Sequence, residues 1–293
     1  MTKSNSRIIL LDVGGTFVKS SLGIAGQGAV EETFASTPIN SDGPAHEIAA
    51  SFREAVHLQT RRAHEEGCTI EAISAALPGP FNYKEGIFMM KHKFASVYGT
   101  SFRDVLGDAA PSHVRLSFVH DVNGVLLGAL AQDPTLSEGN VALSTFGTGL
   151  GFAYSSDGVI QESPAGSPAR DIWNIPYQGG ILEDFVSRRA ILRVYVEQGG
   201  ILAEGEDVKE ISDRARAGEP NAIESFRAAG RHYADGAKEL IAELGIRRIM
   251  FAGQIARSFD LMEEAIREGL GNEIGLDVLD DIQGTVLKGL SNL

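Results

Sequence analysis

Apolar and polar positions along the chain divide it into two kinds of segment. Short aliphatic runs bounded by glycine or proline predict β-strands; these are residues 7–13, 17–24, 70–77, 114–121, 140–146 and 246–252. Longer segments with apolar positions at helical spacing predict helices; these are residues 45–66, 123–133, 182–197, 207–217, 222–244 and 259–268. Residues 83–107 have weak periodicity, which predicts an irregular loop followed by a short helix.

Two of the predicted strand pairs have the same design. In each, a strand runs into a glycine-rich turn and a second strand follows, at residues 7–24 and again at residues 140–156. Setting Gly14 against Gly147 aligns DVGGT with TFGTG, a short internal repeat. The repeat predicts that the two hairpins belong to related halves of the molecule.

The glycine turns suit phosphate binding because backbone N–H groups without a neighbouring Cβ approach an anion closely. The sequence has no GxxxxGK[ST] P-loop, and GTGLG is not followed by the helix of a dinucleotide site. Asp12 is placed to position hydrated Mg²⁺, with Thr16, Lys19 and Thr148 as phosphate donors. The alternative is that these glycines only permit positive φ in tight hairpins and that Asp12 forms an Asx turn.

Asp121 lies at the junction between a predicted strand and a predicted helix. Taken alone, an aspartate in this place is an N-terminal cap. Phosphoryl transfer to an alcohol, however, needs a carboxylate held rigidly within reach of the hydroxyl. Beside two phosphate-binding turns, Asp121 is therefore also a candidate general base.

Composition narrows the classes of partner and compartment. The formal net charge of −13 disfavours a nucleic-acid partner. No segment has the length and apolarity of a membrane span, and the amino terminus lacks the pattern of a signal peptide. Cys68 is the only cysteine, which excludes an intrachain disulfide and fits a reducing compartment. We expect a cytoplasmic protein with no membrane partner.

Five motifs in order resemble the ROK (repressor, open reading frame, kinase) family of sugar kinases. DVGGTFVKSS resembles its first phosphate motif, LPGP its sugar-side turn and HDVNGVLLGAL the segment of its catalytic aspartate, while GTGLGFAYSSDGVI and FAGQI resemble its second phosphate and adenosine motifs. The resemblance spans nearly the whole chain. It implies a two-lobed α/β fold of the actin-like (ribonuclease H-like) ATPase type, with a nucleotide cleft between the lobes.

The resemblance also implies a domain division and site residues. The first lobe would comprise residues 1–119 and the second residues 120–293, with a last helix able to return to the first lobe. Implied contacts to ATP and its phosphates are Asp12, Gly14, Gly15, Thr16, Lys19, Gly147, Thr148, Gly149, Gly253 and Gln254, with Mg²⁺ held through water on Asp12. Implied substrate contacts are Gly79, His120, Asp121 and Glu183, with Asp121 as the catalytic base.

The chain departs from the family pattern on the sugar side. The region AGSPARDIWNIPYQGGILEDFVS has neither the family's E-x-G-H segment nor its zinc cysteines, so we expect no zinc site. Glu183 matches only the glutamate that ends the zinc motif, and His120 replaces an asparagine. Lys91-His92-Lys93 lies in the expected sugar loop and is either a contact for an acidic or unusually shaped substrate or a solvated surface run.

Two functions remain open on the sequence. The first is an ATP- and Mg²⁺-dependent carbohydrate kinase, glucokinase-like or specific for a related hexose or amino sugar. The second is a non-catalytic protein of the same family that senses a sugar or nucleotide. DNA-bound repression is not expected, because the residues before Asp12 are too few for a helix-turn-helix. A homodimer is compatible with the resemblance.

Overall fold

The computed structural model describes residues 6–293 and divides into two compact units. Residues 1–5 lie outside the described residues. The predictions that they belong to the first lobe and that they lack a signal-peptide pattern are therefore not addressed by the structure. Unit 1 comprises the chain up to Thr135 together with Glu162–Pro168 and Gln283–Leu293. Unit 2 comprises Leu136–Gln161 and Ala169–Ile282.

Unit 1 is built on a six-stranded mixed sheet with the order β3-β2-β1-β5-β8, in which β4 also pairs with β2. Its strands are β1 (Ser6–Val13), β2 (Phe17–Ile24), β3 (Gly28–Ala29), β4 (Ala35–Pro38), β5 (Thr69–Leu77) and β8 (Arg115–His120), and β6 (Phe81–Asn82) and β7 (Ile87–Phe88) form a separate hairpin. Its helices are α1 (Ala45–Glu65), α2 (Phe102–Leu106), α3 (Asp121–Gln132) and α9 (Ile282–Leu290).

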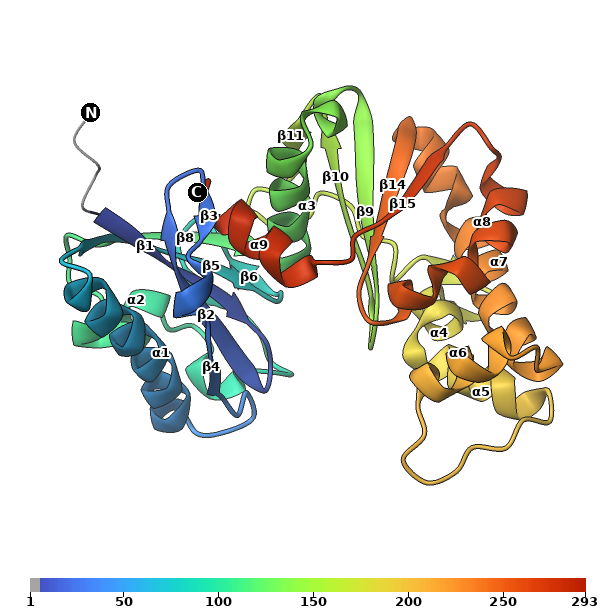
Figure 1. Ribbon diagram of the computed structural model, residues 1–293, viewed down its shortest axis with the longest axis horizontal. Coiled ribbons are helices and arrows are strands. Elements are labelled where there is room, and N and C mark those ends of the chain that lie inside the picture. Colours follow the sequence, from blue (N-terminus) through green and yellow to red (C-terminus); the bar gives the residue numbers. More distant parts are fainter. Residues whose placement is uncertain (1–5) are drawn as a thin grey trace. The chain divides into compact units, whose positions relative to one another are not determined.

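The alternation of side chains in the central strands gives this sheet two buried faces. Ile9 and Leu11 of β1 lie in one apolar cluster with Phe52 of α1. The other face of β5 meets α3, where a Cβ on Gly124 would stand 3.5 Å from that of Ala76. Helices α3 and α9 lie side by side (Figure 1), and the missing side chain of Gly128 lets their backbones approach closely.

Unit 2 repeats the architecture of unit 1. Its five-stranded sheet has the order β11-β10-β9-β14-β15, with an antiparallel hairpin followed by two parallel strands, as in β2-β1-β5-β8. The equivalence of the two hairpins that the internal repeat predicts is therefore present in the topology. The strands are β9 (Asn140–Phe146), β10 (Leu150–Ser156), β11 (Val159–Ile160), β14 (Ile246–Ala252) and β15 (Gly275–Val278), and β12 (Pro176–Tyr177) pairs with β13 (Gly180–Ile181).

The helices of unit 2 lie together (Figure 1), and their buried apolar side chains contribute to one core. They are α4 (Glu183–Val186), α5 (Arg188–Glu197), α6 (Val208–Arg216), α7 (Pro220–Glu243) and α8 (Glu263–Leu270), with a 3-10 helix at Ile255–Leu261. Tyr233 of α7 is fully buried with its ring 5.0 Å from that of Phe146, and its hydroxyl lies 2.6 Å from Ser144 Oγ. These contacts fix α7 against β9, the strand that leads into the second glycine turn.

Most predicted elements are present with small differences at their ends. The predicted helix 182–197 is two helices, because Ser187 has an extended backbone between α4 and α5. The break lets the N–H of Arg188 donate to the carbonyl of Gly147 at 3.0 Å. The segment predicted as a helix at 259–268 begins instead in the 3-10 helix and continues as α8.

The compact units differ from the division after residue 119 that the resemblance implies. Helix α3 stays with unit 1 because it packs on β5 and β8 of that sheet. The last helix also packs on unit 1, where Lys288 Nζ donates to the carbonyl of Gly26 at 2.9 Å. Asp121 therefore belongs to the same unit as the first glycine turn. No helix within residues 6–293 is long and apolar enough to cross a membrane.

Candidate functional site

The first glycine turn connects β1 to β2 in unit 1. Cross-strand register pairs Asp12 with Lys19, and Lys19 Nζ lies 3.5 Å from Asp12 Oδ2. The N–H of Gly14 donates to the carbonyl of Phe17 at 2.9 Å, which closes the turn, and Thr16 is exposed at its tip. Neither Gly14 nor Gly15 has a left-handed backbone. Positive φ therefore does not explain the glycines at this turn.

Asp12 is held in a partly desolvated position beside a second carboxylate. Burial raises the pKa of Asp12, Lys19 opposes that rise, and the negative charge of Asp121 adds to it, so that the pKa lies above its ordinary value. The two carboxylates are thus close enough to interact electrostatically. A site of this kind is suited to a cation, or to a cation bound with phosphate.

Asp121 is the first residue of α3, and its two carboxylate oxygens have different surroundings. Oδ1 accepts the N–H of Val122 at 2.7 Å and lies 2.8 Å from Nδ1 of His120. No donor within residues 6–293 reaches Oδ2. The side chain is 44% exposed. One oxygen thus fixes the carboxylate, and the other is left for a ligand.

The protonation of Asp121 follows from these contacts. Partial burial raises its pKa, but the charge and hydrogen bond of His120, the hydrogen bond from Val122 and the charge of Lys93 together lower it below its ordinary value. The carboxylate is therefore ionised at neutral pH. An ionised carboxylate with one free oxygen can accept a proton from a bound hydroxyl.

Gly79 and Tyr83 surround the His120 ring. A Cβ on Gly79 would stand 3.2 Å from Nε2 of His120, so that glycine leaves room for the imidazole. The ring of Tyr83 meets the His120 ring edge-on, with centroids 5.7 Å apart. Burial, followed by the charge of Asp121, raises the pKa of Tyr83, whose neutral hydroxyl donates to the carbonyl of Leu77 at 3.0 Å. His120 is thus held from two sides.

A polar chain that the sequence does not reveal extends from α3 to residues 162–168. Asn123 is fully buried, and its Nδ2 lies 3.5 Å from Oε1 of Glu162, whose Oε2 accepts from Lys84 Nζ at 2.8 Å. The N–H of Tyr83 donates to the carbonyl of Ala165 at 2.8 Å. Residues 162–168 therefore contact Asn123 and Tyr83, which lie near Asp121 in unit 1. Only Asn123 carries a sequence signal, as a residue of the motif around Asp121.

The second glycine turn connects β9 to β10 in unit 2. The N–H of Gly147 donates to the carbonyl of Gly149 at 3.1 Å, and neither glycine has a left-handed backbone. A Cβ on Gly147 would meet no atom within 4 Å, so the turn presents open backbone at this point. As at the first turn, the glycines are not required by backbone conformation.

Glu183, assigned to the substrate by sequence, lies against this second turn. Its Oε2 accepts the N–H of Leu150 at 2.9 Å, and its Oε1 lies 3.5 Å from Arg189 Nη2. A Cβ on Gly149 would stand 2.8 Å from Oε2. Both oxygens of Glu183 are therefore engaged within unit 2, in a geometry that holds the turn in place.

Gly253 and Gln254 follow β14. Gly253 has φ +106°, and a Cβ there would stand 2.2 Å from the carbonyl oxygen of Phe146. Glycine is thus required both by the backbone conformation and by the close approach of the two strand ends. The approach places Gln254 beside Gly147 and Thr148 on the wall of a cavity.

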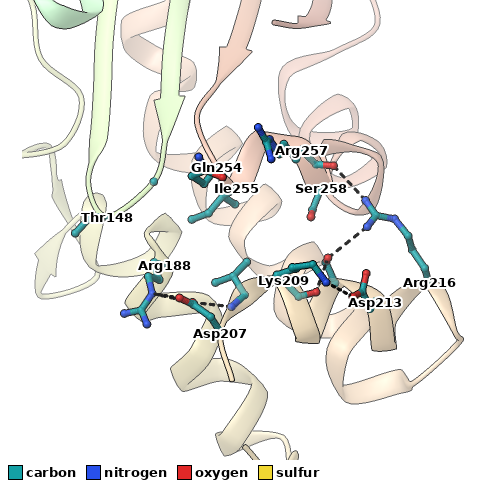
Figure 2. A pocket seen from close by; sticks show the side chains of 13 residues that line it. Thr148, Arg188, Asp207, Lys209, Asp213, Arg216, Gln254, Ile255, Arg257 and Ser258 are labelled. Carbon is teal, nitrogen blue, oxygen red and sulfur yellow. Dashed lines mark hydrogen bonds and ion pairs between the residues drawn. The ribbon is translucent and has the colours of Figure 1, made fainter. Parts of the chain in front are cut away.

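The cavity in unit 2 has a volume of about 550 Å³ (Figure 2). It is lined by Gly147, Thr148, Arg188, Asp207, Val208, Lys209, Ser212, Asp213, Arg216, Gln254, Ile255, Arg257 and Ser258. Figure 2 shows Arg188 directed at Asp207, with Nε 2.7 and 2.9 Å from its two oxygens. Lys209 pairs with Asp213 at 2.9 Å. The volume and the mixture of apolar, amide and cationic groups suit a nucleoside with phosphates.

Arg188, Asp207 and Lys209 are cavity residues that the sequence does not identify. Partial burial raises the pKa of Asp207, but the hydrogen bond from the Val208 N–H and the Arg188 guanidinium lower it below its ordinary value. Asp207 also caps α6 in a capping box with Glu210. Charged residues at helix starts usually serve the helix alone, so their sequence pattern carries no signal of a cavity.

The donor set suits Mg²⁺ only in its usual phosphate-bound form. No group of three or more His, Cys, Asp or Glu side chains within residues 6–293 could hold a metal ion. Mg²⁺ in phosphate-transfer sites commonly keeps several waters and binds one or two carboxylates plus phosphate oxygens. Asp12 beside the first turn fits that requirement.

Comparisons with known proteins agree with the fold. A hexokinase of the ROK family from Thermus thermophilus is 22% identical, with 98% of this chain and 97% of that chain covered and a TM-score of 0.74. A ROK glucokinase from Streptomyces griseus, solved with glucose and AMPPNP, is 18% identical with 98% of both chains covered and a TM-score of 0.74. These likenesses confirm the predicted α/β fold of the actin-like type.

The same fold also occurs in a regulator. A ROK family transcriptional regulator, a homologue of the Escherichia coli MLC protein, is 17% identical, with 98% of this chain and 78% of that chain covered and a TM-score of 0.79. A search of curated proteins gives no match. The model described as the ROK family matches residues 8–274, nearly the whole length. The chain therefore belongs to the ROK family.

Proposed function

We propose that this protein is an ATP-dependent carbohydrate kinase, glucokinase-like or specific for a related hexose or amino sugar. The observation that carries the proposal is the asymmetry of Asp121. Its Oδ1 is fixed by Val122 and His120, whereas Oδ2 has no donor among residues 6–293. The start of α3 does not depend on Asp121 for its cap, because His120 is the N-cap residue and its Nδ1 lies 3.3 Å from the backbone nitrogen of Val122.

In the proposed reaction, the acceptor hydroxyl donates a hydrogen bond to Oδ2 of Asp121. As the hydroxyl oxygen attacks the γ-phosphorus, its proton passes to Asp121, and the bond from phosphorus to the bridging oxygen of ADP breaks. His120 keeps the carboxylate in one orientation throughout. Gly79, His120 and the chain formed by Asn123 and Glu162 are the groups that we assign to the acceptor side.

Each unit has its own proposed part in nucleotide binding. In unit 1 we assign phosphate contacts to the first glycine turn, and in unit 2 we assign phosphate contacts to the second glycine turn and the nucleoside to the cavity beside it. Support comes from Gly147, where a Cβ would meet no atom within 4 Å and the backbone is not left-handed, so neither packing nor conformation requires the glycine. Lys19 and Thr16 are proposed donors at the first turn and Thr148 at the second. Mg²⁺, held through water on Asp12, would neutralise phosphate charge during transfer.

A non-catalytic sensor is the alternative, favoured by one observation. The fold is shared with a transcriptional regulator, so the family likeness alone does not decide for catalysis. A sensor would bind sugar or nucleotide without needing an ionised, oriented Asp121. We also propose that the reaction takes place in the cytoplasm, where ATP is supplied. The expected homodimer stays a prediction.

The proposal is tested by measuring ADP release from Mg-ATP against a panel of hexoses, amino sugars and polyols. We expect one acceptor class to stimulate release in the wild type and not in Asp121→Asn. Asp108→Asn, the same chemical change at an exposed position, is the matched control and should behave as the wild type. Release that no acceptor stimulates, together with retained binding of AMPPNP, would favour the sensor.

A further inference from the structure

Lys93 lies in the loop that follows the β6–β7 hairpin of unit 1, next to a residue with an unusual backbone conformation. The next residue, Phe94, has φ +52° and ψ +25°, a left-handed conformation that is uncommon for a residue with a large side chain. Its ring is fully buried, with the centroids of Phe52 and Phe88 at 5.9 and 5.8 Å. Aromatic packing therefore holds Phe94 in a backbone conformation that it would otherwise avoid, and so fixes the chain next to Lys93.

Two backbone hydrogen bonds tie this point to the first glycine turn. The N–H of Phe94 donates to the carbonyl of Ser41 at 2.7 Å, and the N–H of Ser41 donates to the carbonyl of Gly15 at 3.1 Å. The side chain of Lys93 lies along the turn, because a Cβ on Gly15 would stand 3.7 Å from its Cε and 3.8 Å from its Cδ. Lys93 is thus positioned against the proposed phosphate site and not merely near it.

Near the first glycine turn, the Lys93 ammonium is not engaged by a carboxylate among residues 6–293 and can therefore bind an anionic ligand. Lys19 is engaged by Asp12, whereas Lys93 makes no ion pair within residues 6–293. Without Lys93, the two carboxylates Asp12 and Asp121 outweigh Lys19 by one negative charge. The ammonium of Lys93, together with the Mg²⁺ proposed at Asp12, therefore reduces the repulsion between these carboxylates and a bound γ-phosphate. The charge of Lys93 also acts on Asp121.

Lys91, two residues earlier, has a different environment. Its Nζ lies 5.4 Å from the centroid of the Tyr98 ring. A lysine over an aromatic face makes a favourable cation–π contact there. The two lysines of the same loop are therefore distinguishable, and Lys91 is a matched control for Lys93.

We propose that Lys93 binds the γ-phosphoryl group of the nucleotide and stays bound to it during transfer. The inference rests on the proposed kinase function and adds a residue to its donor side. Lys93 exchanges no proton: the acceptor proton goes to Asp121, and the electron pair of the broken bond stays with ADP. Its ammonium offsets negative charge on the transferred oxygens. The sequence hypothesis of an acidic acceptor would place the same ammonium on the other substrate.

The test compares the binding of Mg-AMPPNP and Mg-ADP by calorimetry in the wild type, Lys93→Met and Lys91→Met. We expect Lys93→Met to weaken AMPPNP about tenfold or more and ADP less than about twofold, because one charge-assisted contact to the γ-phosphate is lost. Lys91→Met should leave both affinities unchanged. Lys93→Arg should recover most of the AMPPNP affinity.

The outcomes separate this inference from the kinase proposal. Equal effects of Lys93→Met on both nucleotides, or no effect, would overturn the assignment of Lys93. So would unchanged AMPPNP binding with a raised KM for the acceptor, which would place Lys93 on the acceptor. If the AMPPNP effect is observed but no acceptor supports turnover, the assignment to the γ-phosphate stands and the kinase proposal fails. A wild type that does not bind AMPPNP contradicts both.

Discussion

The substitution Gly253→Ala tests whether the close approach of β9 and β14 stabilises unit 2 at the second glycine turn. The new Cβ would stand 2.2 Å from the carbonyl oxygen of Phe146, at a residue with φ +106°. A non-glycine residue in a disfavoured backbone region costs about 1–3 kcal/mol. Overpacking in a closely packed region adds about 1–3 kcal/mol. We therefore expect a loss of about 2–6 kcal/mol in the free energy of unfolding of unit 2.

Urea denaturation measures this loss. A loss of about 4 kcal/mol with an m-value of about 2 kcal/mol/M lowers the midpoint by about 2 M. Trp173 is the only tryptophan and belongs to unit 2, so its fluorescence follows the unit that carries the substitution. An unchanged midpoint for Gly253→Ala would refute the packing argument.

Gly147→Ala is the matched control. Its Cβ would meet no atom within 4 Å, and the backbone is not left-handed, so stability should change by less than about 1 kcal/mol. The added methyl group nevertheless covers backbone that we assign to phosphate, so Mg-AMPPNP should bind more weakly. A loss of stability equal to that of Gly253→Ala, with unchanged nucleotide affinity, would contradict the assignment.

Two further predictions concern His120 and Glu183. His120 helps hold the pKa of Asp121 below its ordinary value, so His120→Gln should raise that pKa. The acid limb of the pH–rate profile of kcat/KM should then move to higher pH. An acid limb that does not move would show that His120 does not act through Asp121. Because Glu183 accepts the Leu150 N–H at 2.9 Å, Glu183→Gln should weaken Mg-AMPPNP by about two- to tenfold through the second turn. A rise confined to the KM of the acceptor would instead support the substrate contact that the family resemblance implies for Glu183.

Much of the fold could be predicted from local pattern. The runs 7–13 and 246–252 are apolar and are followed by glycines, so their strands were evident. The similarity of DVGGT to TFGTG predicted that the two hairpins belong to related halves, and the two sheets have a common strand order. The break at Ser187 could not be predicted. Helical spacing of apolar residues continues through Ser187, and the hydrogen bond that the break permits, from the Arg188 N–H to the Gly147 carbonyl, is a tertiary contact. The boundary between the units differs from the implied division after residue 119, because α3 packs on β5 and β8 of unit 1.

The site was predictable where it lies within one motif. Asp12 and Lys19 face each other because a short hairpin fixes their register, and His120 meets Asp121 as its neighbour. Glu162 could not be found, because its contact with Asn123 depends on a segment that returns to unit 1. The cavity cations such as Arg188 were missed because charges on helices usually face solvent.

The position of Lys93 shows how a loop without periodicity can still be specified by its side chains. Charge alone left Lys91 and Lys93 equivalent in the sequence. The burial of Phe94 and its hydrogen bond to Ser41 distinguish them, since both are tertiary contacts over a long separation in the chain.

The most direct test of the account is the single-turnover rate of phosphoryl transfer from ATP labelled at the γ-position, with the acceptor that the panel identifies. Asp121→Asn keeps the size of the side chain but removes the base. We expect this rate to fall by about 10²–10⁴, the usual contribution of a general base, without a loss of Mg-AMPPNP affinity. A transfer rate within about threefold of the wild type would contradict it.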